Sequence, residues 1–143
     1  MWYPEPVFDH LFRLTDSAGI SQHALGAVPD RRFGYCTDDN ARALQVVVAE
    51  LAADSASKVR PLLDVYASAV LFAFDREVGR FRNFMSYERQ WLDRVPSEDC
   101  DARAINGLAG LASSDLGVAY EQPARAVLLE SLSSDPIADS LTA

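Results

Sequence analysis

Cysteine and histidine are scarce in this chain of 143 residues, which has two of each. The two cysteines, Cys36 and Cys100, do not form the dense disulfide framework of small secreted domains, so a reducing cytoplasm is the expected compartment. Two separated histidines with scattered acidic residues show no metal-ligand spacing. We therefore expect no metal ion and no cofactor.

Long apolar runs and an excess of positive charge are also missing. No stretch of about 20 apolar residues exists, and the first residues lack the basic and apolar regions of a signal peptide. With 13 basic and 21 acidic residues, the net charge is -8. This charge disfavours nucleic acid and anionic membranes as partners. A neutral partner such as a sugar is compatible with it.

Two catalytic sequence patterns are absent as well. No glycine-rich phosphate loop is present, so the sequence offers no Rossmann-type site for a nucleotide sugar. No Gly-x-Ser-x-Gly nucleophile pattern is present, and neither cysteine has a recognisable catalytic setting. What remains is a chain that is 49% apolar, a composition that is normal for a globular protein.

Helical periodicity dominates the segments that carry a pattern. Apolar residues recur at helical spacing in five segments, at about residues 5–14, 38–53, 58–74, 97–112 and 118–132. Thr37 or Asp38 is suited to cap the second of these helices. A long polar stretch over residues 15–37 is expected to be a loop of functional importance. An excursion near 76–95, rich in aromatic residues and arginine, is expected to be irregular or a small hairpin.

Two of the helix starts resemble each other. The segments that align without gaps are residues 37–44 and 98–105. Asp38 corresponds to Asp99 and Arg42 to Arg103, so each helix carries an acid and an arginine on one side. If repeated hairpins stack about a common centre, both polar stripes face the same space. The alternative is an ion pair on a solvated face of each helix, worth only about a few tenths of a kcal/mol.

An ordered series of short motifs runs through the same region. The motifs are Arg13-Leu14-Thr15-Asp16, Gln22-His23-Ala24, Val28-Pro29-Asp30, the run from Gly34 through Thr37-Asp38-Asp39-Asn40-Ala41-Arg42 to Leu44, the run from Gly79 through Asn83 to Tyr87, Trp91 and Ser97-Glu98-Asp99. The series covers residues 8–112 and resembles the helical domain found with bacterial glycosyltransferases and mannosyltransferases. The resemblance implies an all-α fold of stacked helical hairpins, an incomplete α/α toroid of the six-hairpin kind, and a carbohydrate as partner.

Glycosidic chemistry commonly uses two carboxyl groups that flank the anomeric carbon. The helix starts supply four candidate catalytic residues: Asp38, Asp39, Glu98 and Asp99. The alternative is that these acids only cap helices and complement helix dipoles. The candidate substrate-binding residues are polar or aromatic and lie in the loops or beside the acids: His23, Tyr35, Asn40, Arg42, Asn83, Tyr87, Trp91 and Arg103. The alternative for the aromatic members is that they cover the ends of a helical layer.

We interpret the chain as a carbohydrate-active domain that acts on or binds a glycan through acidic residues at helix N-termini. If it is an enzyme, glycosyl transfer and glycoside cleavage are the two candidate reactions. A non-catalytic scaffold that binds a glycan or a protein, and a truncated remnant without independent activity, stay open as alternatives. Self-association, or a partner chain that completes the toroid, belongs to these alternatives. A single domain over residues 1–132 with a frayed tail over 133–143 is expected.

Overall fold

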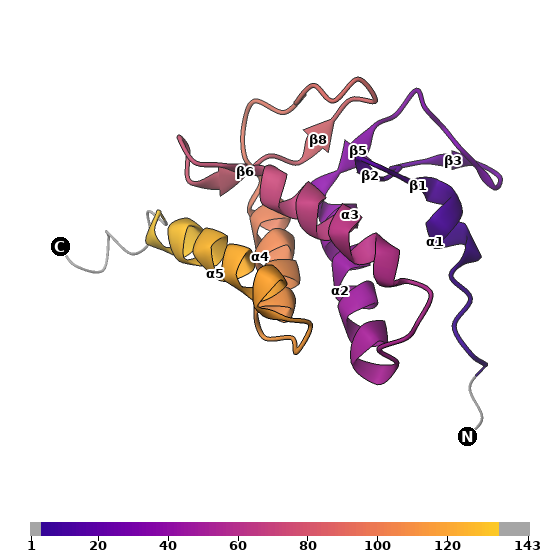
Figure 1. The fold of residues 1–143 in the computed structure, drawn as a ribbon. Helices are drawn as coiled ribbons and strands as arrows, with labels where there is room; N and C mark the ends of the chain where they lie inside the picture. The colour runs from indigo at the N-terminus through magenta and orange to yellow at the C-terminus, as the bar shows by residue number, and fades with distance from the viewer. Residues whose placement is uncertain (1–3, 135–143) are drawn as a thin grey trace.

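A computed structural model describes residues 4–134 of the chain (Figure 1). The helices of this part are α1 (Asp9–Leu14), α2 (Thr37–Ala53), α3 (Arg60–Phe72), α4 (Glu98–Ala112) and α5 (Val118–Ser133). The strands are β1 (Thr15–Asp16), β2 (Gly19–Ile20), β3 (Ala24–Leu25), β4 (Val28–Pro29), β5 (Tyr35–Cys36), β6 (Phe74–Asp75), β7 (Arg80–Phe81) and β8 (Phe84–Met85). Residues 135–143, which make up most of the expected tail, lie outside the described residues.

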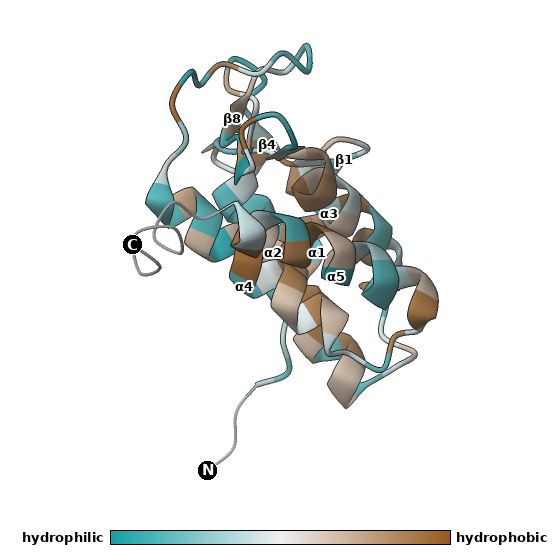
Figure 2. Cartoon of the chain, turned by 90° about the vertical axis from the view of Figure 1, so that its left-hand side faces the viewer, coloured by the Kyte–Doolittle hydropathy of each residue, from teal (hydrophilic) through white to brown (hydrophobic). Residues whose placement is uncertain are grey.

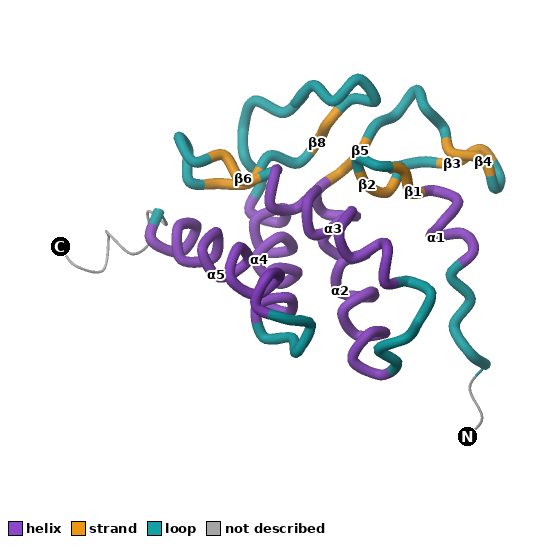
Figure 3. The backbone as a smooth tube through the Cα atoms, in the orientation of Figure 1, coloured by secondary structure: helices purple, strands orange, loops and turns teal. Residues whose placement is uncertain are grey.

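The strands form antiparallel ribbons of two strands each. β1 pairs with β2, β3 with β4 and β6 with β7, so these ribbons are local hairpins. β5 pairs with β8 over a long distance in sequence, with Tyr35 opposite Met85 and Cys36 opposite Phe84. Figure 3 shows the strands at one end of the helical layer. We call this end, where α2 and α4 also begin, the ribbon end.

The all-α toroid of stacked helical hairpins predicted from the sequence is wrong. The described residues are 51% helical and 14% strand, and they form five helices and several small antiparallel sheets, so the fold is mixed α/β. The strand content extends well beyond the excursion expected near 76–95. The strands were not predicted because strands of two residues are too short to show an alternating pattern. The turns of two ribbons are formed by glycines in the left-handed region, Gly26 at φ 61° and Gly79 at φ 73°. Self-association and a partner chain stay predictions, although the described residues contain no toroid for a partner to complete.

The hydrophobic core lies between the four long helices. α2 packs against both α3 and α4, and α5 covers α4. The fully buried side chains include Leu44, Val47, Leu63, Tyr66 and Leu108. Each large apolar side chain buried in this way contributes about 1.5–3 kcal/mol. In Figure 2 the hydrophobic colour concentrates in the helices, and many of the loops at the ribbon end have the hydrophilic colour.

α2 and α4 approach each other closely at a glycine. A Cβ atom placed on Gly107 of α4 would lie 3.1 Å from the main-chain oxygen of Ala41 on α2. Gly107 and Ala41 are both buried, so small residues bring the two helix axes together. The close contact packs the start of α2 against the middle of α4, and it lets Arg103 of α4 reach Asp38 of α2. None of the helices between residues 4 and 134 combines the length and apolar content that a membrane crossing requires.

Candidate functional site

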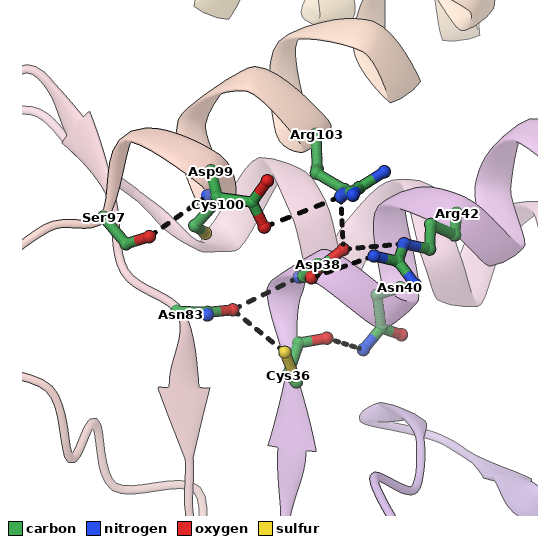
Figure 4. A network of polar contacts seen from close by, with 9 residues as sticks. All are labelled: Cys36, Asp38, Asn40, Arg42, Asn83, Ser97, Asp99, Cys100 and Arg103. Atoms are coloured by element: carbon green, nitrogen blue, oxygen red, sulfur yellow. Dashed lines mark hydrogen bonds and ion pairs between the residues drawn. The ribbon is translucent and has the colours of Figure 1, made fainter.

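Four charged side chains from the first two turns of α2 and α4 meet between the two helices (Figure 4). Asp38 Oδ1 lies 2.9 Å from Arg42 Nε on its own helix and 3.1 Å from Arg103 Nε on α4. Arg103 Nε also lies 3.7 Å from Asp99 Oδ2. The two Asp–Arg pairs identified in the sequence are thereby joined into one group. We call these four residues the acid–arginine cluster.

Asp38 is the most enclosed member of the acid–arginine cluster. Its side chain is 18% exposed, whereas those of Arg42 and Arg103 are 52% and 41% exposed. Asp38 Oδ1 is shielded from solvent, and its contacts with the two Nε atoms lack hydrogen-bond geometry. The other oxygen, Asp38 Oδ2, accepts a hydrogen bond from Arg42 Nη2 at 3.4 Å, so charge attraction without a hydrogen bond describes only the contact with Arg103. Asp38 serves as an electrostatic link between two helices.

The start of α2 is held by a residue that is distant in sequence. Asn83 Oδ1 accepts hydrogen bonds from the Asp38 N–H at 3.3 Å and from the Cys36 thiol at 3.0 Å. The Thr37 hydroxyl donates to the main-chain oxygen of Arg82 at 2.7 Å. Neither Thr37 nor Asp38 caps the helix, contrary to the sequence prediction, and Cys36 occupies the cap position without a side-chain cap bond. The polar group of Asn83, a predicted substrate-binding residue, is thus engaged in shaping the helix start.

Asp39 lies beside the acid–arginine cluster and outside its ion pairs. Burial raises the pKa of the Asp39 carboxyl, and the charge of Asp38 raises it further. The charges of Arg42 and His23 lower this pKa to a smaller extent. The carboxyl forms no side-chain hydrogen bond with another residue of the described part. A raised pKa favours the protonated form that a general acid needs.

The two remaining candidate carboxyls are open to solvent. Asp99 is 69% exposed and lies 3.7 Å from Arg103, while Glu98 is exposed in the first turn of α4. Ser97 caps this helix, and its hydroxyl oxygen accepts a hydrogen bond from the Cys100 N–H at 3.4 Å. The four predicted catalytic acids therefore occupy different settings. Asp38 is ion-paired, Asp39 is half-buried and unpaired, and the two acids of α4 are largely hydrated.

Two of the predicted substrate-binding residues have their polar atoms bound within the protein. The Tyr35 hydroxyl donates to Asp16 Oδ2 at 2.6 Å, and the Tyr35 side chain is buried. Asn40 donates from Nδ2 to the main-chain oxygen of Cys36 at 2.9 Å and accepts at Oδ1 from the Ile20 N–H at 3.0 Å. Both residues fix loops to the start of α2. Neither offers an open polar group to a ligand.

The other predicted aromatic residues and His23 lie at the ribbon end in different environments. Trp91 is half-buried and stacks on Phe72 with ring centroids 5.7 Å apart, so it covers the end of α3. His23 is exposed and meets the Phe33 ring edge-on at 4.5 Å. Tyr87 is 40% exposed. Tyr87 and His23 are thus the members of this group that a ligand can reach.

Three cavities of more than 300 Å³ lie outside the acid–arginine cluster. One of about 660 Å³ lies between α3 and α5, and one of about 400 Å³ lies between the loops around residues 31–34 and 84–93. The third, of about 340 Å³, lies between β7, α4 and α5, and Glu98 lines it. Asp38, Asp39 and Asp99 line none of these three cavities. Three of the four predicted acids are therefore separate from these cavities, and Glu98 is the exception.

Two carboxylates that shape the ribbon end were not predicted from the sequence. Asp93 accepts hydrogen bonds from the N–H of Asn83 at 2.8 Å and from that of the next residue at 2.9 Å. Asp101 accepts from the Phe81 N–H at 2.9 Å and forms an ion pair with Arg80. Asp101 belongs to the group of acids in the first turn of α4, and the segment near 76–95 is rich in arginine. An ion pair between these two segments could therefore have been predicted from the sequence. For Asp93 the sequence contains no comparable signal.

Comparison with known proteins does not place the chain in a family. No protein-family model matches the chain, and no curated protein matches it significantly. The resemblance to the domain of bacterial glycosyltransferases therefore rests on the quoted motifs. Within residues 4–134, no three His, Cys, Asp or Glu side chains are grouped so that they could hold a metal ion.

Proposed function

We propose that this chain is a carbohydrate-active domain that holds a glycan at the ribbon end, and that Asp39 supplies the proton-transfer group. The observation that carries this proposal is the setting of Asp39. It is half-buried, its pKa is raised, and it adjoins charged residues from two helices that are distant in sequence. The choice of a carbohydrate as the ligand rests on the resemblance of the motif series to the domain found with bacterial glycosyltransferases.

Burial is the main cause of the raised pKa of Asp39, and the acid–arginine cluster adds to it in this proposal. Arg42 and Arg103 fix the Asp38 carboxylate, and the negative charge of Asp38 raises the pKa of Asp39 further. Two neighbouring carboxyls whose environments differ in this way are typical of acid–base sites. A protonated Asp39 would donate its proton to the glycosidic oxygen that leaves. Asp99, the exposed acid at the facing helix start, is our candidate for the second carboxyl.

A second candidate function is glycan binding without chemistry. The observation that favours it is the engagement of Asp38 by two arginines, which leaves Asp39 as the one unpaired acid of α2's first turn. Glycoside chemistry generally needs two carboxyl groups at a defined separation. In this case the ribbon end binds the glycan and another chain performs the reaction.

We place either activity in the cytoplasm, because Cys36 and Cys100 are free thiols.

Thermal melts with a panel of neutral oligosaccharides test the carbohydrate proposal. A sugar present at about 100 times its dissociation constant adds roughly 2.7 kcal/mol to the free energy of unfolding, which raises the melting temperature. A panel that leaves the melting temperature unchanged contradicts the binding of a neutral glycan.

Activity assays on the sugars that bind separate the two candidate functions. Asp39→Asn is expected to retain the cooperative melt and to abolish hydrolysis or transfer. Asp115→Asn is the matched control, because Asp115 is an exposed acid in the connection between α4 and α5. Turnover that survives in Asp39→Asn removes Asp39 from the mechanism. Binding without turnover in the wild type selects the non-catalytic function.

A further inference from the structure

The ribbon end contains a cavity that the proposed chemistry does not use. It has a volume of about 400 Å³ and lies between residues 31–34 and the segment from β8 to residue 93. We call it the loop cavity. Its volume is within the range of about 300–1,000 Å³ that is usual for small-molecule sites. Three aromatic side chains line it, and Phe33, Phe84 and Tyr87 are 46%, 41% and 40% exposed.

Two of these rings are braced by neighbouring side chains. His23 supports Phe33 edge-on at 4.5 Å. Tyr87 stacks on the buried Tyr35 at 6.5 Å, and the guanidinium carbon of Arg31 lies 5.6 Å from the Tyr87 ring centroid. Rings that are already held lose little conformational freedom when a ligand binds. The loop cavity therefore has preorganised apolar walls.

Four polar side chains line the loop cavity and form no hydrogen bond or ion pair with another residue of the described part. They are Gln22, Arg31, Tyr87 and Glu88. The amide and the phenol both donate and accept, the guanidinium donates, and the carboxylate accepts. A sugar hydroxyl is likewise both a donor and an acceptor. This mixture of groups matches a polyhydroxylated ring that also has apolar C–H faces.

The charges that line the loop cavity balance one another. Arg31 is offset by Glu88, and both are exposed. Arg32 is neutralised by the buried Asp30, which accepts from Arg32 Nε at 2.9 Å and from its terminal nitrogen at 2.6 Å. Asp93 is held by two main-chain N–H groups. The loop cavity therefore has no unbalanced cation that would attract a phosphate or carboxylate ligand.

We propose that the loop cavity binds one ring of a neutral glycan. The apolar face of the ring lies against Phe33 or Phe84, and its hydroxyl groups bond to Gln22, Arg31 and Glu88. The inference rests on the proposed function for the ligand class, and it adds the place of binding and the neutrality of the ring. Anchoring a ring here leaves the rest of the glycan to extend over the ribbon end.

Calorimetric titration and amide NMR of the whole chain test this inference. The probes are the neutral trisaccharides maltotriose, cellotriose and mannotriose, with glucuronic acid and glucose 6-phosphate as anionic sugars. Phe33→Ala is expected to raise the dissociation constant of the bound trisaccharide about five- to tenfold, since an aromatic contact of this kind contributes about 1 kcal/mol or more. Glu88→Gln is expected to weaken binding as well. The amide signals of Gly34 and Ser86, which line the loop cavity, are expected to shift with sugar.

Matched controls separate the loop cavity from general effects. Phe72→Ala removes an exposed aromatic ring outside the loop cavity, and Glu77→Gln removes an exposed acid in the β6–β7 turn. Both are expected to bind the trisaccharide as the wild type does. Thermal melts of every variant establish that it is folded, and Glu88→Gln keeps the test valid if Phe33→Ala does not fold.

The outcomes distinguish this inference from the proposed function. Wild-type affinity in both Phe33→Ala and Glu88→Gln overturns the loop cavity as the site and leaves carbohydrate binding in place. Anionic sugars that bind more tightly than the neutral trisaccharides overturn the neutral-ring assignment. A wild type that binds no sugar overturns the proposed function, and the inference falls with it.

Discussion

Arg103 on α4 places its Nε atom 3.1 Å from Oδ1 of Asp38 on α2. The same nitrogen lies 3.7 Å from Asp99, and Arg42 lies against Asp38 at 2.9 Å. In each Asp–Arg pair the two residues are four positions apart on the same helix, and the Asp38–Arg103 contact connects the two pairs. The first turns of α2 and α4 are therefore linked by charge. Because Asp39 follows Asp38 directly, its position depends on this link.

The first prediction concerns the loss of the central charge of the acid–arginine cluster. Asp38→Asn is expected to lower the free energy of unfolding by about 1–2 kcal/mol, because Arg42 then loses its anion and Arg103 keeps only the longer 3.7 Å contact with Asp99. The cost stays below that of a fully buried pair because both arginines are about half-exposed. Urea unfolding at pH 7 and low salt measures it.

A double-mutant cycle with Arg103→Gln isolates the contact between the helices. The two substitutions are expected to cost less together than the sum of their separate costs, since either one removes the same ion pair. Costs that add within about 0.5 kcal/mol would mean that the Asp38–Arg103 contact does not stabilise the fold.

The second prediction uses two glycines of α4 that differ in their surroundings. A Cβ on Gly107 would lie 3.1 Å from the main-chain oxygen of Ala41, while a Cβ on Gly110 would meet nothing within 4 Å. Gly107→Ala is expected to destabilise the fold by about 1–3 kcal/mol through overpacking. Gly110→Ala is expected to stabilise it by up to about 1 kcal/mol through helix propensity. Equal stabilisation of both variants in urea unfolding would contradict the close helix contact.

The helices could be predicted from the sequence, and of the ribbons only a small hairpin near residues 76–95 was suggested. Leu44, Val47 and Leu51 recur at helical spacing, so the pattern that locates α2 is contained in α2 itself. The pairing of Tyr35 with Met85 joins residues that are distant in sequence through strands of two residues. Such short strands show no periodicity. The mixed α/β fold could therefore not be predicted from the sequence pattern, and the resemblance of the motifs predicted an all-α fold instead.

The same limit applies to the candidate site. The duplicated Asp–Arg spacing indicated that Asp38 and Arg103 belong to equivalent helix starts, and the structure brings them together. The bonds from Asn83 and Asp93 that shape the ribbon end connect separate loops. A single hydrogen bond between loops requires only one polar residue at each end, so it produces no repeated spacing.

The third prediction concerns acid stability. Asp75 accepts hydrogen bonds from Arg82 at 3.0 Å and 2.7 Å, and this guanidinium lowers the pKa of the Asp75 carboxyl. The folded-state pKa is then below the unfolded value of about 3.9. The resulting stabilisation is present above about pH 4 and is lost as the pH falls through the folded-state pKa.

Arg82→Gln is therefore expected to be less stable than the wild type at pH 6, and the difference is expected to narrow below about pH 4. Urea midpoints at pH 6, 5, 4 and 3 measure this change. Arg13→Gln is the control, because Arg13 is exposed and forms no ion pair within the described residues. A difference between Arg82→Gln and wild type that is constant with pH would show that the ion pair does not set the pKa of Asp75.

The last prediction concerns Asp39, whose pKa is raised by burial and by Asp38. A carboxyl whose folded-state pKa lies above its unfolded value stabilises the fold at low pH, and this contribution is lost as the pH rises through the folded-state pKa. Asparagine carries no charge, so Asp39→Asn is expected to raise the urea midpoint at pH 7. The gain is expected to vanish at about pH 3, where the carboxyl is largely protonated in both states. Carboxyl NMR titration measures the pKa itself, and Asp38→Asn is expected to lower it.

The sign of this stability change bears on the role of Asp39. A variant that gains stability and loses turnover shows the trade-off that is typical of a functional residue. Asp115→Asn, which changes the net charge equally at an exposed position, is expected to leave the urea midpoint and the sugar response unchanged. A loss of stability in Asp39→Asn at pH 7 would mean that the ionised carboxyl favours the fold through the α2 dipole. Asp39 would then be a structural acid at a helix N-terminus, and its assignment as the proton donor would be wrong.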